Sequence, residues 1–432
     1  MSFPAHFLIG AATAAHQVEG NNVDSDCWAL ENIKHSDYLE KSGEAVDHYH
    51  RYEEDIRLLA EAGLNAYRFT IEWARIEPEE GKFNKQEIEH YRSVIQACRI
   101  RGVEPVVTLH HFSSPVWLIR KGGWEADTTP DDFARYVEYV MTNLGKELTY
   151  VCTINEANMG LQIAAIAKRY MREMLRGGKK KKQSTDGQVQ MGMNLETMLK
   201  NMAMAGQEKI EAVGVKDPKV FQSMRTKKGD LLIMQAHTKA REVIRRIAPH
   251  VKVGLTLSLH DIQPVRGGEK QAEKIWAEEF THYLPYIQED DFLGVQNYTR
   301  TLVARSGDIG VPQGAETTQM AYEFYPEALG HVLERVSKDF KHDLIVTENG
   351  IATSDDAERC EFIRRAMRSV EECLKKNVPV KGYIHWSLMD NFEWQKGFSM
   401  HFGLIAVDRT DMSRHPKESL KLLGSYQQGS NA

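Results

Sequence analysis

Short apolar runs alternate with amphipathic segments along most of the chain. The runs are rich in β-branched and aromatic residues and end at polar or turn-forming residues, as buried strands do. Segments between them, such as residues 47–63, 85–102 and 130–145, carry apolar positions at helical spacing, and each ends in glycine. Strands are predicted at residues 7–17, 66–71, 104–111, 150–156, 251–258, 292–298, 343–348 and 380–387. Eight strands with helices between them favour parallel pairing through crossover helices, and therefore an α/β fold closed into a single (β/α)8 TIM barrel.

The chain of 432 residues has room for two or three average domains or for one large barrel. No Pro/Ser-rich linker and no internal repeat divides it, so we expect one domain over residues 1–432. The least regular region, Gly160–Lys228, is expected to be an insertion after the fourth strand. It holds a lysine-rich stretch, Gly177–Ser184, for which a solvated loop is favoured over an anion-binding patch. Its methionine-dense stretch, Met191–Met204, fits helix packing better than an adaptable lid.

Charge and composition narrow the classes of partner. With 55 basic and 61 acidic residues the formal net charge is −6, which gives no general attraction to nucleic acid or to an anionic membrane. No apolar run approaches the roughly 18 residues that span a bilayer. The apolar run at residues 7–15 has no basic residue before it, so it is interpreted as a strand and not as a signal peptide. The five scattered cysteines never form C-x-x-C and indicate buried thiols in a reducing cytoplasm, and no His/Cys cluster has metal-ligand spacing, so no metal or cofactor is expected.

Two of the predicted strands end in a glutamate. Residues 343–348 run straight into Glu348, and residues 150–156 end in Glu156, which follows Asn155. The carboxyl ends of parallel barrel strands meet at one mouth, so these two side chains could face each other there. A retaining glycosidase needs two carboxyl groups about 5 to 5.5 Å apart, one as nucleophile and one as acid and base. We therefore expect Glu156 and Glu348 to form a catalytic pair.

The end of the last predicted strand has the composition of a sugar site. Trp386 and Trp394 flank Asp390, Asn391 and Glu393 on a strand-to-loop transition. Indole faces stack on the C–H surfaces of sugars, and a carboxylate accepts two hydroxyl hydrogen bonds. A buried aromatic cluster with polar caps is the structural alternative for this segment.

Taken together, these motifs resemble glycoside hydrolase family 1, the retaining β-glucosidase and β-galactosidase family. The likeness covers nearly the whole chain except Gly160–Lys228. The matching stretches lie at residues 7–20, 66–73, 110–118, 153–156, 346–350 and 386–394, with further likeness near 414–419.

The resemblance implies a retaining β-glucosidase, with β-galactosidase or β-fucosidase side activity. It would hydrolyse terminal non-reducing β-D-glycosides, in small β-glycosides or oligosaccharides, through a covalent glycosyl-enzyme intermediate. In it, Glu348 is similar to the nucleophile, Glu156 to the acid and base, and Arg68 and Tyr298 to residues that orient the nucleophile. The implied sugar-binding residues are Gln17, His111, Asn155, Gln296, Tyr298, Trp386, Glu393, Trp394 and Phe402. Of these, Trp386 resembles the stacking floor and Asn155 the contact to the 2-hydroxyl, whose hydrogen bonds strengthen in the transition state.

The sequence departs from the family pattern in several places. Ala157 follows Glu156 where the family usually has proline, which affects loop stiffness more than chemistry. Gln296 replaces the usual asparagine and is followed by Asn297, so either residue could face the sugar. Phe112 and Ser113 replace the pair that is commoner in the family after the histidine. Because Gly160–Lys228 does not match the usual sequence after the fourth strand, the family's leaving-group preference cannot be assigned to this chain.

Two other functions are compatible with this fold. The 6-phospho-β-glycosidases of the family carry serine at the Glu393 position and use a lysine and a tyrosine farther along for phosphate, whereas this chain has Glu393 and Phe402. A non-catalytic carbohydrate-binding barrel would typically have lost one of the two glutamates. The sequence does not choose among glucose, galactose and fucose, and it leaves the oligomeric state open, including a homo-oligomer.

Overall fold

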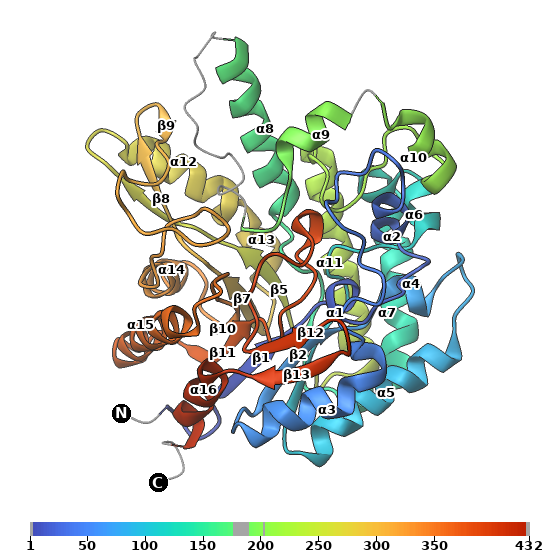
Figure 1. Cartoon of the computed structure of the whole chain (residues 1–432), viewed down its shortest axis with the longest axis horizontal. Coiled ribbons are helices and arrows are strands. Elements are labelled where there is room, and N and C mark those ends of the chain that lie inside the picture. Colours follow the sequence, from blue (N-terminus) through green and yellow to red (C-terminus); the bar gives the residue numbers. More distant parts are fainter. Residues whose placement is uncertain (1–2, 176–189, 202–203, 429–432) are drawn as a thin grey trace.

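The computed structural model describes residues 3–175, 190–201 and 204–428, and it contains the predicted barrel. The barrel strands are β1 (Leu8–Ala12), β2 (Ala66–Thr70), β3 (Glu104–Thr108), β4 (Tyr150–Cys152), β5 (Lys252–Ser258), β7 (Phe292–Gln296), β10 (Asp343–Glu348) and β11 (Val380–Trp386). They pair in parallel and close in the order β1-β11-β10-β7-β5-β4-β3-β2 (Figure 1). The (β/α)8 prediction is confirmed.

Helices surround the closed sheet. The longer ones are α3 (His48–Glu61), α5 (Lys85–Ile100), α7 (Thr129–Leu144), α8 (Met159–Leu175), α11 (Lys227–Ile247), α12 (Glu269–Glu279), α14 (Ala328–Val336), α15 (Asp356–Lys375) and α16 (Glu418–Gln428). Shorter helical segments are α1 (Ala15–Val18), α2 (Asp26–Glu31), α4 (Trp73–Ile76), α6 (Val116–Arg120), α9 (Leu195–Asn201), α10 (Gly206–Val213), α13 (Leu284–Ile287), η1 (Gly123–Glu125), η2 (Gly145–Glu147), η4 (Thr281–Tyr283) and η5 (Trp394–Lys396). Two small sheets lie outside the barrel, namely β6 (Asp261–Pro264) with β8 (Arg300–Ala304) and β9 (Gly307–Asp308), and β12 (Ile405–Asp408) with β13 (Ser413–Pro416).

Side-chain caps explain where several helices begin. Asn84 precedes α5 and accepts a hydrogen bond from the backbone N–H of Gln86. Thr226 caps α11 and Asp355 caps α15 in the same manner. Such caps satisfy backbone N–H groups that have no partner within the helix, and each stabilises the helix by about 1 kcal/mol. The barrel strands themselves are almost wholly buried, because helices cover their outer faces and side chains fill the interior.

Several predicted strands end earlier than expected, and the first and the fourth show the largest differences. The first, predicted over residues 7–17, ends at Ala12, and the chain then turns into α1. The fourth, predicted to reach Glu156, ends at Cys152. The reason is local, because Glu156 has a φ of 43° and its backbone N–H donates to the side chain of Thr256 and not to a ladder partner. Glu156 therefore lies on the loop after β4.

A buried chain of hydrogen bonds fixes α3 to the barrel. Asp55 Oδ2 lies 2.7 Å from His48 Nδ1, and His48 Nε2 lies 2.9 Å from the hydroxyl of Tyr67 on β2. That hydroxyl lies 2.7 Å from Thr13 Oγ1. Arg414, from β13, donates to the other oxygen of Asp55 at 2.7 Å. Each polar group has a partner, as buried polar groups require.

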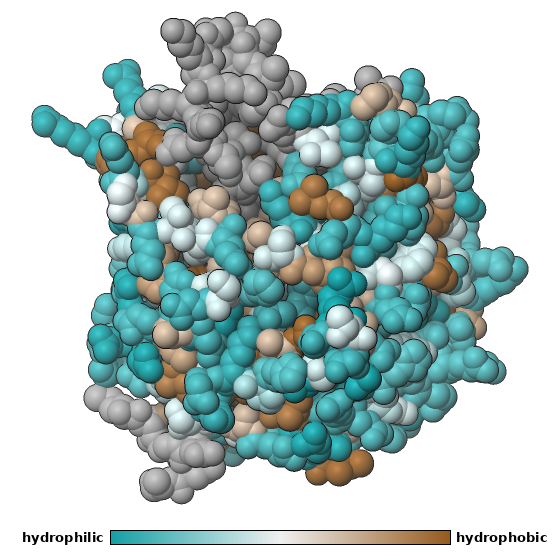
Figure 2. All heavy atoms as spheres, in the orientation of Figure 1, coloured by the Kyte–Doolittle hydropathy of each residue, from teal (hydrophilic) through white to brown (hydrophobic). Residues whose placement is uncertain are grey.

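The insertion after β4 is described in part. Helix α8 extends beyond the barrel at the top of Figure 1. The lysine-rich stretch, residues 177–184, lies outside the described residues. The methionines of the second stretch differ in burial: Met191 and Met193 are buried, whereas Met204 is exposed. The face shown in Figure 2 is mostly hydrophilic, with hydrophobic residues scattered over it. Within the described part of the chain, no helix is long and apolar enough to cross a membrane, and no three His, Cys, Asp or Glu side chains are grouped as metal ligands would be.

Candidate active site

The residues singled out in the sequence gather at the carboxyl ends of the barrel strands. Arg68 is on β2, Gln296 and Glu348 end β7 and β10, and Trp386 ends β11. Others follow strands directly, with Gln17 after β1, His111 after β3, and Asn155 and Glu156 after β4. All of them are buried. Residues more than three hundred positions apart are thus brought to one end of the barrel, where enzymes of this architecture have their active sites.

Three donors hold the carboxylate of Glu348. Oε1 accepts from Arg68 Nη1 at 2.7 Å and from Gln296 Nε2 at 2.8 Å, and Oε2 accepts from the hydroxyl of Tyr298 at 2.7 Å. Burial raises the pKa of Glu348, while Arg68 and Tyr298 act against that rise. This set of contacts fixes the carboxylate in one orientation and favours its ionised form.

Glu156 has a very different environment. Its Oε2 is buried and has no hydrogen-bond partner in the described part of the protein. Burial, and then the charge of Glu348, raise the pKa of Glu156 well above its ordinary value, while Arg68 acts in the opposite direction. Two carboxyl groups whose surroundings separate their pKa values in this way are suited to act as an acid and an anion.

The backbone of Glu156 is held in an unusual conformation. A φ of 43° is in the left-handed region, which non-glycine residues seldom adopt and which is concentrated at functional sites. Two contacts with Thr256 on β5 support it: the Glu156 N–H donates to the Thr256 hydroxyl at 2.9 Å, and the Ala157 N–H donates to the Thr256 carbonyl at 3.1 Å. Ala157 therefore provides a backbone hydrogen bond that a proline at this position would lack.

Asn155 joins the two sides of the mouth. Its Oδ1 accepts from Arg68 Nη2 at 2.6 Å, from Gln296 Nε2 at 2.8 Å and from the Thr256 hydroxyl at 3.2 Å. Its Nδ2, 3.1 Å from His111 Nε2, is then the donor of that pair. Burial, followed by the charge of Arg68, lowers the pKa of His111 well below its ordinary value, so this ring is neutral and carries its proton on Nδ1.

Glu393 is a third buried acid in the same region. Its Oε2 accepts from Gln17 Nε2 at 3.2 Å, and its Oε1 accepts from the backbone N–H of Gly192 at 2.8 Å. Burial raises the pKa of Glu393 to about 7, and the nearby Glu348 adds to the rise. Near neutral pH this group is therefore divided between its charged and neutral forms.

Aromatic side chains enclose the site. The rings of His111 and Trp386 have centroids 5.6 Å apart with an interplanar angle of 27°, and the ring of Trp394 is 6.1 Å from that of His111. Phe402 meets Tyr298 edge-to-face at 6.1 Å. Such a lining combines apolar faces with polar groups that have hydrogen-bonding capacity left, which suits a ligand with C–H faces and hydroxyl edges.

The structure separates the two neighbours that sequence reasoning left undecided. Gln296 faces Glu348, whereas Asn297 Nδ2 donates to the backbone carbonyls of Leu259 and Thr299 and so supports the loop. The roles proposed for the individual site residues stay predictions.

Sequence reasoning missed other residues of the site. Tyr322 is buried beside Tyr298, its hydroxyl has no partner within the described residues, and its pKa is raised by burial and then by Glu393 and Glu156. It lies on an irregular loop between β9 and α14, where no periodicity marks it. The contact of Gly192 with Glu393 spans 201 positions and leaves no local signal either.

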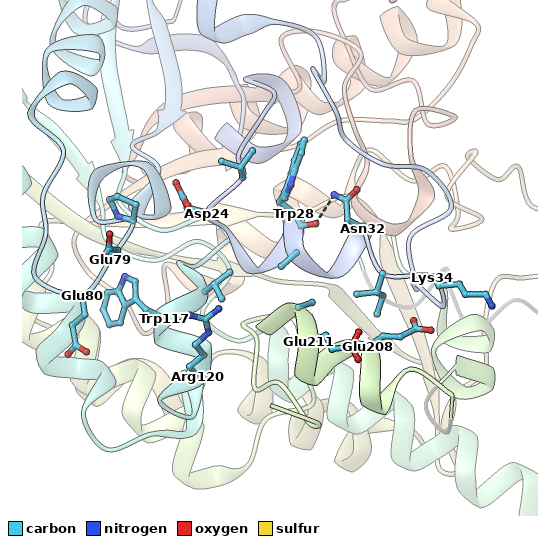
Figure 3. A pocket seen from close by; sticks show the side chains of 16 residues that line it. Asp24, Trp28, Asn32, Lys34, Glu79, Glu80, Trp117, Arg120, Glu208 and Glu211 are labelled. Atoms are coloured by element: carbon cyan, nitrogen blue, oxygen red, sulfur yellow. Dashed lines mark hydrogen bonds between the residues drawn. The ribbon is translucent and has the colours of Figure 1, made fainter. Parts of the chain in front are cut away.

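A groove of about 1060 Å³ lies outside this site, between α2, α6, α10 and the loop after α4 (Figure 3). Its lining includes Trp28 and Trp117 as well as several charged residues, but neither Glu156 nor Glu348. The indole N–H of Trp117 donates to the carbonyl of Glu77, and the cations of Lys121 and Arg135 each lie 5.5 Å from its ring. The Trp117 ring is therefore already covered, and the groove does not contain the Glu156 and Glu348 pair found at the barrel mouth.

Comparisons with known proteins agree with the geometry. The sequence profile of Glycosyl hydrolase family 1 matches residues 1–189 and 281–429. The crystal structure of beta-glycosidase BGL167 is 42% identical, has a TM-score of 0.85, and the match covers 99% of this chain and 97% of that one. Beta-glucosidase A of Thermotoga maritima is 27% identical over 96% of each chain. A 6-phospho-beta-galactosidase of Lacticaseibacillus casei is 29% identical, again over 96% of each. The chain belongs to glycoside hydrolase family 1 and is a glycoside hydrolase of the (β/α)8 type.

Proposed function

We propose that the protein is a retaining β-glucosidase that removes terminal, unphosphorylated β-D-glycosyl groups from small β-glycosides or oligosaccharides. The observation that carries the proposal is the contrast between the two acids. Glu348 is held by a guanidinium, an amide and a hydroxyl, whereas the carboxyl group of Glu156 is buried with a strongly raised pKa. The names of the glucosidase relatives support the same activity.

In the first step the ionised Glu348 attacks the anomeric carbon of the sugar. The bond from that carbon to the glycosidic oxygen breaks, and Glu156 gives its proton to the departing oxygen. The product is a glycosyl ester of Glu348 and the free aglycone. Arg68 and Tyr298 keep the nucleophile ionised and aimed until the bond forms.

In the second step the same pair works in reverse. Glu156, now an anion, takes a proton from water, and the resulting hydroxide attacks the anomeric carbon and displaces Glu348. Two inversions at one carbon leave the β configuration unchanged. The loss of negative charge from Glu348 in the intermediate lowers the pKa of Glu156, because Glu348 is one of the groups that raise it, and this allows Glu156 to change from acid to base.

The polar atoms around the acids suit the hydroxyls of a sugar. Within the described residues, buried atoms without a partner include Gln17 Oε1, His111 Nδ1, Gln296 Oε1 and the Tyr322 hydroxyl. Buried polar atoms normally find partners, and the hydroxyls of a glycone can act as both donors and acceptors. We assign Trp386 as the stacking floor, with Trp394 and Phe402 enclosing the ring.

A phosphorylated glycone is disfavoured by the same site. Glu393 is buried close enough to Glu348 for their charges to interact, so a phosphate near it would add negative charge to an acidic pocket. Comparing the hydrolysis of p-nitrophenyl β-glucoside with that of its 6-phosphate decides between the two activities. Preference for the phosphate would contradict the proposal and favour the activity named for the Lacticaseibacillus casei relative.

The catalytic assignment is tested by removing each acid. We expect Glu348→Ala to lower kcat/KM by on the order of 10,000-fold. Azide, which is small enough to occupy the space of the lost carboxylate, should restore turnover and yield the α-glycosyl azide. Glu156→Ala should damage substrates with poor leaving groups far more than activated aryl glycosides. The exposed Glu53→Ala is the control, and near-normal activity of Glu348→Ala would refute the assignment.

The surroundings of the enzyme are part of the proposal. All five cysteines are unpaired and buried, which supports a reducing compartment such as the cytoplasm. The full chain, residues 1–432, is proposed to act as one glycosidase domain.

A further inference from the structure

A segment in the middle of the insertion after β4, residues 190–194, lies against a residue of the candidate sugar site. Residues 190–194 precede α9 and are followed in sequence by the helices on the rim. In this segment Met191 and Met193 are 4% and 3% exposed and pack into the main hydrophobic core. The segment is therefore built into the wall of the mouth.

Its contact with Glu393 is direct. The backbone N–H of Gly192 donates to Glu393 Oε1 at 2.8 Å, while Gln17 donates to Oε2 at 3.2 Å. Each carboxylate oxygen of Glu393 thus has one protein donor, and each keeps a second lone pair for a ligand hydroxyl. The directions of those remaining lone pairs depend on where Gly192 and Gln17 hold the carboxylate.

Further hydrogen bonds attach the segment to the same loop. The N–H of Gln395 donates to the Gly192 carbonyl at 3.1 Å. Asn194 binds Gln395 twice, through its own N–H to Oε1 and through Nδ2 to the backbone carbonyl, each at 2.6 Å. These bonds connect Gly192 and Asn194 to Gln395, the middle residue of η5.

A third attachment reaches Tyr298, a neighbour of the proposed nucleophile. Gln190 Oε1 accepts from the backbone N–H of Tyr298 at 2.6 Å, and its Nε2 donates to Ser258 Oγ at 2.9 Å. Tyr298 is the residue whose hydroxyl binds Glu348. One short segment thus supports both Glu393, on the sugar side, and Tyr298, beside the nucleophile.

We propose that residues 190–194 form a specificity-determining wall of the glycone pocket, in which Gly192 is a positioning residue for Glu393. The proposal rests on the function proposed above and adds that residues 190–194 set which sugar hydroxyls bind to Glu393. The family profile leaves residues 190–280 unmatched, so the wall lies outside the stretches that the profile covers.

A substitution at Gly192 can disturb its contact with Glu393. A Cβ at this position would lie 2.4 Å from the carbonyl oxygen and 2.9 Å from Cγ of Glu393. Its φ is outside the left-handed region, so alanine would suit the backbone and only the space is lacking. Gly192→Ala must therefore displace Glu393 or the segment itself.

The experiment measures kcat and KM on p-nitrophenyl β-glucoside and on its 3-, 4- and 6-deoxy analogues. We expect Gly192→Ala to lower kcat/KM on the parent glucoside by about tenfold or more, because buried polar groups of a pocket built for hydroxyls become mispaired. The loss should shrink to about twofold on the analogue that lacks the hydroxyl bound by Glu393. A loss of equal size on every analogue would indicate a general structural effect and overturn the proposal, as would no loss at all.

Gly206→Ala is the matched control. Gly206 is in the same insertion, at the start of α10, and a Cβ there would meet only the flexible end of Lys216. It should leave all four substrates within about twofold of wild type, since alanine is tolerated in a helix at least as well as glycine.

A binding measurement separates this proposal from the proposed function. If the wild-type protein hydrolyses no aryl β-glycoside, the proposed function fails, and calorimetric binding of deoxynojirimycin, a glucose-shaped amine, decides the inference. Gly192→Ala should weaken that binding by about tenfold and Gly206→Ala should not change it. Equal binding by all three proteins, or no binding by the wild type, would overturn the inference.

Discussion

Nη1 of Arg68 lies 2.7 Å from Oε1 of Glu348, and their side chains are 0% and 5% exposed. A charge buried to this degree is stable only with a partner, so each of the two fixes the ionisation of the other. The guanidinium also donates to Asn155 and to Thr108, which leaves it little freedom to move. The anion at the end of β10 is thus prepared before any ligand arrives.

Removing this cation should move the pH dependence of the reaction. Glu348 acts as an anion, and Arg68 lowers its pKa, so Arg68→Met should raise that pKa and shift the acidic limb of the kcat/KM profile to higher pH. At neutral pH we expect a loss of about 100-fold.

Arg68→Lys keeps a cation and should shift the acidic limb less than Arg68→Met. The surface variant Arg57→Met is the control. An unchanged acidic limb in Arg68→Met would show that this contact does not control the ionisation of Glu348.

The alkaline limb should belong to Glu156. Its pKa is raised by burial and by Glu348, and its protonated form is the acid, so activity should fall as pH rises through that pKa. Glu156→Gln cannot ionise, and its residual activity on activated aryl glycosides should therefore lack this fall. We would measure kcat/KM between about pH 5 and 9, the range in which paired acids of this kind titrate. Persistence of the wild-type limb in Glu156→Gln would assign it to another group, with Glu393 as the first to examine.

Tyr322→Phe should weaken the binding of substrate without lowering the stability of the fold. The Tyr322 hydroxyl is buried without a partner in the described part of the chain, so its removal should leave Tm unchanged or slightly higher. If the hydroxyl instead binds a sugar, KM should rise by about three- to tenfold, because one hydrogen bond is lost, with little change in kcat. Paired thermal melts and steady-state kinetics test this, and an unchanged KM would place Tyr322 outside the binding site.

Asp55 should make the fold sensitive to acid. Burial opposes its ionisation, but hydrogen bonds from His48 and Arg414 hold its pKa below the ordinary value. A carboxylate with a lowered pKa contributes stability that is complete above its unfolded pKa and is lost as pH falls through its folded one. Asp55→Ala leaves the charge of Arg414 buried without its anionic partner, so we expect a loss of about 3 kcal/mol in the free energy of unfolding at pH 7.

The difference between wild type and Asp55→Ala should narrow as the pH falls below about 4, where the unfolded carboxyl group protonates. Urea unfolding at several pH values measures it. A difference that stays constant over the whole range would mean that Asp55 acts through packing alone.

The sequence predicted the barrel well because its strands carry their signal locally. Residues 343–348 form the strand that was expected there, since an apolar run that stops at a polar turn is sufficient to define it. The fourth strand was predicted too long, because the left-handed turn at Glu156 depends on Thr256 of the next strand and not on neighbouring residues. The local sequence pattern therefore predicted which strands exist, but it did not predict where each strand ends.

The same distinction between local and tertiary signals separates the site residues that the sequence predicted from those that it missed. Glu348 and Glu156 could be found because each ends an apolar run, and the family motifs supplied most of the surrounding residues. Gly192 and Tyr322 could not be found, because one acts through its backbone and the other from an irregular loop. Both are brought to the mouth by tertiary contacts that no short window of sequence records.

The order of strands has a consequence for how such an enzyme can diversify. Between β4 and β10 stand β5 and β7, each bonded to its neighbours around a ring with no free edge. The separation between the ends of β4 and β10, from which the two glutamates are positioned, is therefore fixed by the two strands between them. The barrel thus keeps the positions of the two glutamates constant. Changes in glycoside preference are therefore expected in the segments around the barrel mouth.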